Sequence, residues 1–236
     1  MIKFFRKIRY DLMEKNKTGK YLKYAIGEIA LVVIGILIAL QINNWNENKK
    51  SNTFENEILT QIQTNLKQDK LNLEIILKNY GNAIKSSNKI LKSEVSEKSK
   101  DSIHIWLGAV IQFDRFQPLT NAYEVLKSNG LDKVSNKKLR FLLGTYYDDK
   151  ASHMVKSISD IETAFNDHWT PILMEEMVDF EFRKSIVLKD YSILLKPSKA
   201  QNILKLNRDN YVFGINRIIR GIATIEEIQD LIKKEI

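Results

Sequence analysis

One apolar run dominates this sequence of 236 residues, Tyr24-Ala-Ile-Gly-Glu-Ile-Ala-Leu-Val-Val-Ile-Gly-Ile-Leu-Ile-Ala-Leu-Gln-Ile42. After the leading tyrosine its only ionisable residue is Glu28, and its only other strongly polar residue is Gln41. Its 19 residues approach the ~20 that a helix needs to cross a hydrocarbon layer ~30 Å thick. A helix in a soluble core usually keeps a polar stripe, whereas residues 29–40 are apolar on every side. The run therefore predicts a transmembrane helix.

The residues before this run are strongly basic. Through Lys23 the chain holds eight Lys and Arg residues against two acidic ones, so six of its eight net positive charges lie there. Because positive flanks stay in the cytoplasm, we expect a cytoplasmic N-terminus and an external chain after about Trp45. Tyr21, Tyr24 and Trp45 fall where aromatic side chains anchor a span at its two surfaces.

A cleaved signal peptide is the alternative to a permanent anchor, because a positive segment precedes the apolar run. The run is longer than the usual ~7–15 residues of such a peptide, and Gln41-Ile-Asn-Asn-Trp45 offers no pair of small residues for cleavage. An uncleaved signal anchor fits better. The predicted organisation is a cytoplasmic basic segment at 1–23, a transmembrane helix at 24–44 and a periplasmic helical domain at 45–236.

The first residues carry apolar side chains at helical spacing, with basic ones between them. This pattern predicts a short helix on the cytoplasmic leaflet, where each Lys or Arg contributes ~1 kcal/mol of attraction to anionic lipid. The alternative is a frayed, solvated tail. The apolar residues are Phe4, Phe5, Ile8 and Leu12, and the basic segment consists of Lys3, Arg6, Lys7 and Arg9.

Inside the span, Glu28, Gly35 and Ala39 share one helical face, which we call the partner face. Small residues let a second helix approach closely, and an acid within a membrane helix is by default a functional candidate. The alternative is that Glu28 reaches the cytoplasmic headgroups and Lys20 or Lys23, since it lies only about one turn from Tyr24.

Beyond the membrane the apolar periodicity is helical almost throughout, and it predicts an all-α bundle of elongated helices. Thr53 is the expected N-cap of the first helix. The alternative is that this helix is a continuation of the transmembrane helix. The segment 180–195 is rich in β-branched and aromatic residues, so a short hairpin stays open there. The other expected helices cover 102–113, a segment from Thr120 to Gly130, 136–169 with Ser135 as cap and Pro171 as terminator, and the chain beyond Pro197, where isoleucines recur at a heptad-like step.

This body offers no recognisable catalytic or cofactor chemistry. The chain has no Cys, and its three histidines include no His pair at i, i+4, so no metal site is expected. No glycine-rich nucleotide loop or nucleophile elbow is present, and we expect no cofactor. The nearly neutral body does not offer the basic face that tracks phosphates, so nucleic acid is not an expected partner.

Two polar features stand out in the helical domain. Asp69 lies between Leu66 and Leu73 on an apolar stripe, where it pairs with a base, binds a ligand or lies at a solvent gap. The segment 111–118 places Asp114 and Arg115 between aromatic residues, as expected for a partner-facing edge or for a hinge between helices.

Two stretches resemble a family of uncharacterised single-pass membrane proteins from Bacteroidota. The first is the apolar run, continued through Asn43-Asn-Trp-Asn-Glu47 and preceded by residues 1–9; the second is Pro118-Leu-Thr-Asn-Ala-Tyr-Glu-Val-Leu-Lys-Ser-Asn-Gly-Leu131, with shorter matches up to Tyr147. The resemblance implies a Gram-negative inner-membrane protein and transfers no catalytic residue. It also draws attention to an interface motif, Gln41, Asn43, Asn44 and Trp45, because a mere anchor needs only hydrophobicity.

The sequence thus favours a single-pass inner-membrane protein that is not an enzyme and acts as an interaction or scaffold subunit of the cell envelope. Its expected partners are the lipid bilayer and either a membrane or envelope protein or further copies of itself. One alternative is a periplasmic sensor that signals through a partner. The other is a membrane-tethered hydrolase, which would require Asp69, His104 and His168 to converge in one deep pocket.

Overall fold

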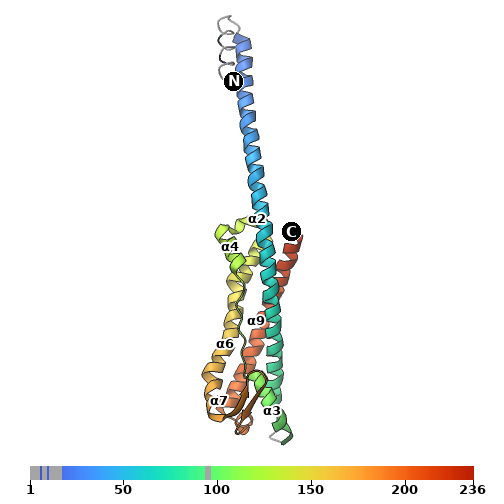
Figure 1. Cartoon of the computed structure of the whole chain (residues 1–236), viewed down its shortest axis with the longest axis vertical. Helices are drawn as coiled ribbons and strands as arrows, with labels where there is room; N and C mark the ends of the chain where they lie inside the picture. The colour runs from blue at the N-terminus through green and yellow to red at the C-terminus, as the bar shows by residue number, and fades with distance from the viewer. Residues whose placement is uncertain (1–5, 7–9, 11–17, 94–96) are drawn as a thin grey trace. The chain divides into compact units, whose positions relative to one another are not determined.

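The computed structural model describes residues 6, 10, 18–93 and 97–236, and this part of the chain is all-α apart from one hairpin (Figure 1). The all-α prediction is therefore confirmed. In chain order the elements are α2 (Thr18–Lys92), α3 (Glu97–Val110), α4 (Asn121–Asn129), the 3-10 turn η1 (Leu131–Lys133), α5 (Lys137–Gly144), the π-helical turn η2 (Thr145–Lys150), α6 (Ala151–Ala164), the π-helical turn η3 (Phe165–Trp169), α7 (Thr170–Glu176), β1 (Met177–Glu181), β2 (Ser185–Leu188), α8 (Ser192–Leu195) and α9 (Lys199–Glu235).

The chain forms two compact units, Met1–Phe54 and Glu55–Ile236, and α2 contributes residues to both. Thr53 does not cap a helix; α2 runs through it, which is the alternative of continuation that the sequence left open. Its hydroxyl donates to the backbone carbonyl of Lys49 within α2, at 3.0 Å. Residues 43–55 contain neither Gly nor Pro, so nothing in the sequence ends the helix there.

In the second unit, α9 packs along α6, and its buried residues recur every seven positions: Tyr211, Ile218, Ile225 and Ile232. This confirms the heptad-like step expected beyond Pro197. The Tyr211 ring also lies against Tyr80 of α2, with a centroid distance of 4.9 Å. The core thus joins helices that are far apart in the sequence.

The helical run expected at 136–169 is longer and less regular than predicted. Asn136, not Ser135, is its N-cap, because the Asn136 side chain accepts the Leu139 N–H. The run continues past Pro171 to the end of α7. The π-helical turn η3 precedes this proline, and Pro171 sits in the first turn of α7, where a missing N–H costs little.

The hairpin lies at 177–188 and overlaps 180–195, the segment where the sequence allowed a short hairpin. Its antiparallel register pairs Phe180 with Ile186. α3 packs closely against β2. A Cβ on Gly108 of α3 would lie 2.4 Å from the backbone carbon of Lys184, so only glycine permits this approach. At the turn, Arg183 has a φ of 66°, a left-handed conformation that non-glycine residues seldom adopt.

Candidate functional site

The apolar segment of α2 is exposed along its whole length in the first unit. Every side chain from residue 29 to residue 40 is exposed, including Leu31 at 64% and Ile38 at 55%. Its most apolar window of 18 residues has a mean hydropathy of 2.5, and none of that window is buried within the described structure. By length and composition, this helix is long and apolar enough to cross a membrane.

The partner face lies on this helix. Gly35 and Ala39 are exposed and Glu28 is half-buried. A Cβ on Gly35 would have no described atom within 4 Å, so the close approach that small residues allow is open at this position. The role of this face in binding stays a prediction.

The interface motif follows on the same helix. Gln41, Asn43, Asn44 and Trp45 are all exposed, and Trp45 retains 65% of its accessible surface. The Lys49 ammonium lies 5.6 Å from the centre of the Trp45 ring. An aromatic ring beside a cation suits the polar boundary of a membrane, where amphipathic rings are enriched.

The basic segment is mostly outside the described residues. Lys3, Lys7 and Arg9 lie there, as do the four apolar residues of the expected surface helix. Arg6 is described, is helical and is exposed.

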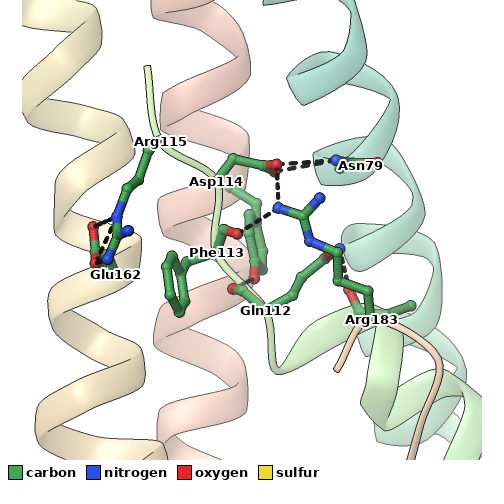
Figure 2. A network of polar contacts seen from close by, with 9 residues as sticks. Asn79, Gln112, Phe113, Asp114, Arg115, Glu162 and Arg183 are labelled. Atoms are coloured by element: carbon green, nitrogen blue, oxygen red, sulfur yellow. Dashed lines mark hydrogen bonds and ion pairs between the residues drawn. The ribbon is translucent and has the colours of Figure 1, made fainter. Parts of the chain in front are cut away.

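The expected helix at 102–113 ends instead at Val110, and residues 111–120 form an irregular connection to α4 that we call the linker. Asp114 lies near the centre of the linker (Figure 2). Its side chain is buried, with only 6% of its surface exposed. Its carboxylate accepts hydrogen bonds from Arg183 at 2.6 Å and from Asn79 at 3.1 Å. Arg183 also donates to the Phe113 carbonyl at 2.8 Å. The hairpin turn and α2 therefore hold the middle of the linker in place.

Further contacts fix the linker on either side of Asp114. The Tyr211 hydroxyl donates to the Val110 and Gln112 carbonyls at 2.7 and 3.1 Å. Arg115 forms a two-point ion pair with Glu162 of α6 (Figure 2), with Nε 3.1 Å and Nη2 2.5 Å from the same oxygen. Because Arg115 is exposed, this pair contributes less than the Asp114 contacts. The linker is tied to several elements and so differs from a free hinge.

Asp69 holds the end of the linker. It is fully buried, and its carboxylate accepts the Leu119 N–H at 3.1 Å and the Tyr146 hydroxyl at 2.9 Å. Burial raises the pKa of Asp69 above its ordinary value, while both hydrogen bonds act in the opposite direction. Of the three readings left open by the sequence, the solvent gap is excluded, and these contacts give the carboxylate a structural role.

The described residues contain no group of three or more His, Asp or Glu side chains able to hold a metal ion. The carboxylate of Asp69 is engaged by the linker and Tyr146, whereas His168 is exposed on η3. The residues that line the hollow beside His168 include neither Asp69 nor His104. The structure therefore gives no support to a pocket that joins Asp69, His104 and His168.

Sequence patterns did not single out three residues that hold the linker: Asn79, Glu162 and Arg183. Arg183 and Asp114 are 69 positions apart, so only the folded chain brings them together. Arg183 has a left-handed backbone, which a residue with a side chain seldom adopts. The hairpin turn imposes this conformation, so the spacing of apolar residues in the sequence does not reveal it.

The described part of the chain is helical, with one exposed helix long and apolar enough to cross a membrane and a linker fixed by buried carboxylates. A family of unknown function (DUF6090) matches residues 28–157, which is more than half of the chain. The chain belongs to this family. The match includes the partner face, the interface motif and the whole linker. No curated protein and no solved structure matches the chain.

Proposed function

We propose that this is a single-pass membrane protein, anchored by the apolar part of α2, that presents residues 45–236 as a helical domain outside the cytoplasm. In this proposal the domain is a non-enzymatic interaction or scaffold subunit of the cell envelope. The observation that carries it is the apolar window of α2, of which no part is buried within the described structure.

Exposure to water of such a helix would be costly. Residues 29–40 include nine Ile, Leu and Val side chains, and burial of each contributes about 2 kcal/mol. Their combined burial exceeds the ~5–15 kcal/mol by which a typical domain is stable. A lipid bilayer would bury all of them at once, and the helix satisfies its own backbone hydrogen bonds there.

Charge supports the orientation of the proposal. The net charge of +6 before residue 24 favours a cytoplasmic N-terminus, and residues 43–62 carry two lysines against three acids. The Gram-negative inner membrane, in a member of the Bacteroidota, is proposed from the sequence resemblance alone.

An interaction role accounts for features that anchoring does not require. A generic span needs only hydrophobicity, yet this one combines Glu28, Gly35 and Ala39 on one face and carries a polar interface motif. Such a face suits a second membrane helix, either of another envelope protein or of another copy of this chain.

Topology is tested with reporters fused after Ile236. Alkaline phosphatase, which is active only outside the cytoplasm, should be active there, while green fluorescent protein should be dark. Replacement of Lys3, Arg6, Lys7 and Arg9 by Glu should reduce the phosphatase signal, since the basic segment sets the direction. A bright green fluorescent fusion of the unmodified chain would refute the orientation.

The partner face is tested by photocrosslinking in the membrane. A photoreactive residue at Gly35 or Ala39 should give discrete protein adducts, identified by mass spectrometry. Val33 and Leu37 point to the opposite side of an ideal helix and serve as matched controls. Equal crosslinking at all four positions would contradict a dedicated face.

A further inference from the structure

One side of α9 exposes large apolar side chains, opposite the side that forms the core. The core side is the series of residues from Tyr211 to Ile232 at seven-residue steps, all fully buried. The exposed apolar residues all lie between positions 205 and 220, in a region that we call the outer face of α9. They are Leu206 at 66%, Val212 at 44%, Phe213 at 54% and Ile219 at 51% exposure.

A helix on the surface of a bundle normally turns polar side chains to water. Helix α6 follows this rule, because its exposed residues are all polar: Ser152, His153, Lys156, Ser159 and Thr163. Beyond Arg220, the exposed residues of α9 are likewise charged, apart from Ala223. The apolar exposure is therefore a local property of the outer face and not of the whole helix.

The exposed apolar residues form two lines along the helix, Leu206 with Phe213 and Val212 with Ile219. The members of each pair are seven positions apart, so they recur at nearly the same angle on a helix of about 3.6 residues per turn. The exposed side chains of Asp209 and Asn216 lie between the two lines. A lipid surface would bury these polar groups without hydrogen-bond partners, whereas a protein helix can offer them donors and acceptors.

The unpaired charges on this face are positive. Its acid, Asp209, already forms an ion pair with Arg208 at 3.1 Å. Arg217 lies over the Phe213 ring, 5.0 Å from its centre, and Arg220 is exposed. Within the described residues, neither Arg217 nor Arg220 pairs with a carboxylate. Arginine beside an aromatic ring is typical of binding hot spots, and a guanidinium binds a carboxylate through parallel hydrogen bonds.

We propose that the outer face of α9 binds an acidic amphipathic helix of a partner protein, which covers the exposed apolar side chains and pairs carboxylates with Arg217 and Arg220. A second copy of the face carries the same unpaired arginines and so does not supply these carboxylates. The proposal rests on the interaction role proposed above, and it adds the surface and the chemistry of the partner. The topology reporters and the crosslinking at Gly35 do not involve this face, so its failure and that of the proposed function are distinguishable.

The test uses the full chain in phosphatidylcholine nanodiscs, with empty nanodiscs as the blank. The probe is a fluorescent three-heptad peptide with Leu at the first and fourth positions of each heptad, Glu at the positions beside them and Ala elsewhere. Two control peptides replace every Glu by Gln or by Lys. Anisotropy should show saturable binding of the Glu peptide and at least about tenfold weaker binding of both controls. Absence of saturable binding, or equal affinity for the Glu and Gln peptides, would overturn the proposal.

Three variants locate the binding, each checked for folding by circular dichroism. Arg217→Glu/Arg220→Glu should lower affinity for the Glu peptide at least about tenfold and raise affinity for the Lys peptide, because it reverses the charge of the face. Phe213→Ser removes an exposed ring and should weaken binding about tenfold. Lys233→Glu/Lys234→Glu makes the same charge change in the last turn of α9 and should leave binding unchanged. Glu-peptide binding that survives reversal of both arginines would refute the proposal.

Two other occupants of the face would give different results, and either result would overturn the proposal. Vesicles of phosphatidylglycerol and phosphatidylcholine that float with the unmodified chain, but not with Phe213→Ser, would assign the face to anionic lipid. A dimer seen by sedimentation velocity in the unmodified chain, and lost in Phe213→Ser, would assign it to a second copy. We expect neither vesicle binding nor oligomeric state to depend on Phe213.

Discussion

Asp69 offers the most direct test of how the linker is held. Asp69→Ala removes the acceptor of both the Leu119 N–H and the Tyr146 hydroxyl. The hydroxyl is buried, whereas Leu119 is 40% exposed, so we assign the larger share of the loss to Tyr146. A buried group left without its partner costs about 1–3 kcal/mol.

Together these losses predict a destabilisation of about 2–3 kcal/mol. This range already allows for a small gain, because the variant no longer buries a carboxylate, and burial raises the pKa of Asp69. For a unit of this size, 1 kcal/mol corresponds to about 2–4 °C, so Tm should fall by roughly 5–10 °C. Asp69→Asn keeps an oxygen for Leu119 and an amide that the Tyr146 hydroxyl can accept from, so its effect should stay within about 1 kcal/mol.

The assay is thermal unfolding of the full chain in detergent, followed by far-UV circular dichroism. Tyr146→Phe removes one donor and should cost about 1–2 kcal/mol. The double variant Asp69→Ala/Tyr146→Phe should be less destabilised than the two single variants combined, because the orphaned hydroxyl is then absent. A Tm for Asp69→Ala within 1 °C of the unmodified chain would show that Asp69 does not hold the linker, and strict additivity in the double variant would show that Asp69 and Tyr146 are not coupled.

Three other predictions concern the same unit. The pKa of Asp69 is raised in the folded state, so the native protein takes up a proton before the unfolded chain does as the pH falls. The stability of the unmodified chain relative to Asp69→Asn should therefore rise on acidification and level off below the unfolded pKa of ~3.9. Urea unfolding at several pH values measures this difference. Arg183→Ala should lower the free energy of unfolding by about 2 kcal/mol, and Arg183→Gly by about 1 kcal/mol less, because glycine accepts a φ of 66°; equal losses would contradict strain at the turn. Gly108→Ala should cost more than ~2 kcal/mol in a chemical unfolding series, because its Cβ would meet the hairpin backbone, whereas Gly81→Ala, with nothing within 4 Å, should be neutral or stabilising.

The linker explains why the second stretch of family resemblance matters structurally. Pro118 and Leu119 begin that stretch, and the Leu119 N–H is the donor that Asp69 accepts. The segment therefore carries a position that must meet a buried carboxylate on α2.

Local patterns in the sequence predicted much of the fold. Residues 24–42 predicted a transmembrane helix, and the structure has a long, exposed apolar helix there. The seven-residue step from Tyr211 to Ile232 indicated the buried face of α9. The end of α4 at Gly130, where φ is 101°, followed from an ordinary stop signal. The helix also starts after Thr120 as predicted, although the Thr120 side chain makes no capping hydrogen bond. These features are predictable because side-chain periodicity and backbone preference act over a few neighbouring residues.

Continuity and irregularity in the helices were harder to predict. Thr53 and Pro171 were expected to mark helix ends, yet both lie within helical segments. Thr53 satisfies its hydroxyl within α2, and Pro171 occupies the first turn that follows η3, so neither residue acts as a boundary in this context.

By itself, then, the sequence determined the helical class, the long apolar helix and the uneven charge, because each is a property of neighbouring residues. Only the tertiary structure decided what the polar groups meet. Asp69 accepts a hydrogen bond from Tyr146, 77 positions away, and Asp114 accepts one from Arg183, 69 positions away. An apolar stripe tells which face of a helix is buried, but packing against distant segments fixes which donor or acceptor stands opposite it.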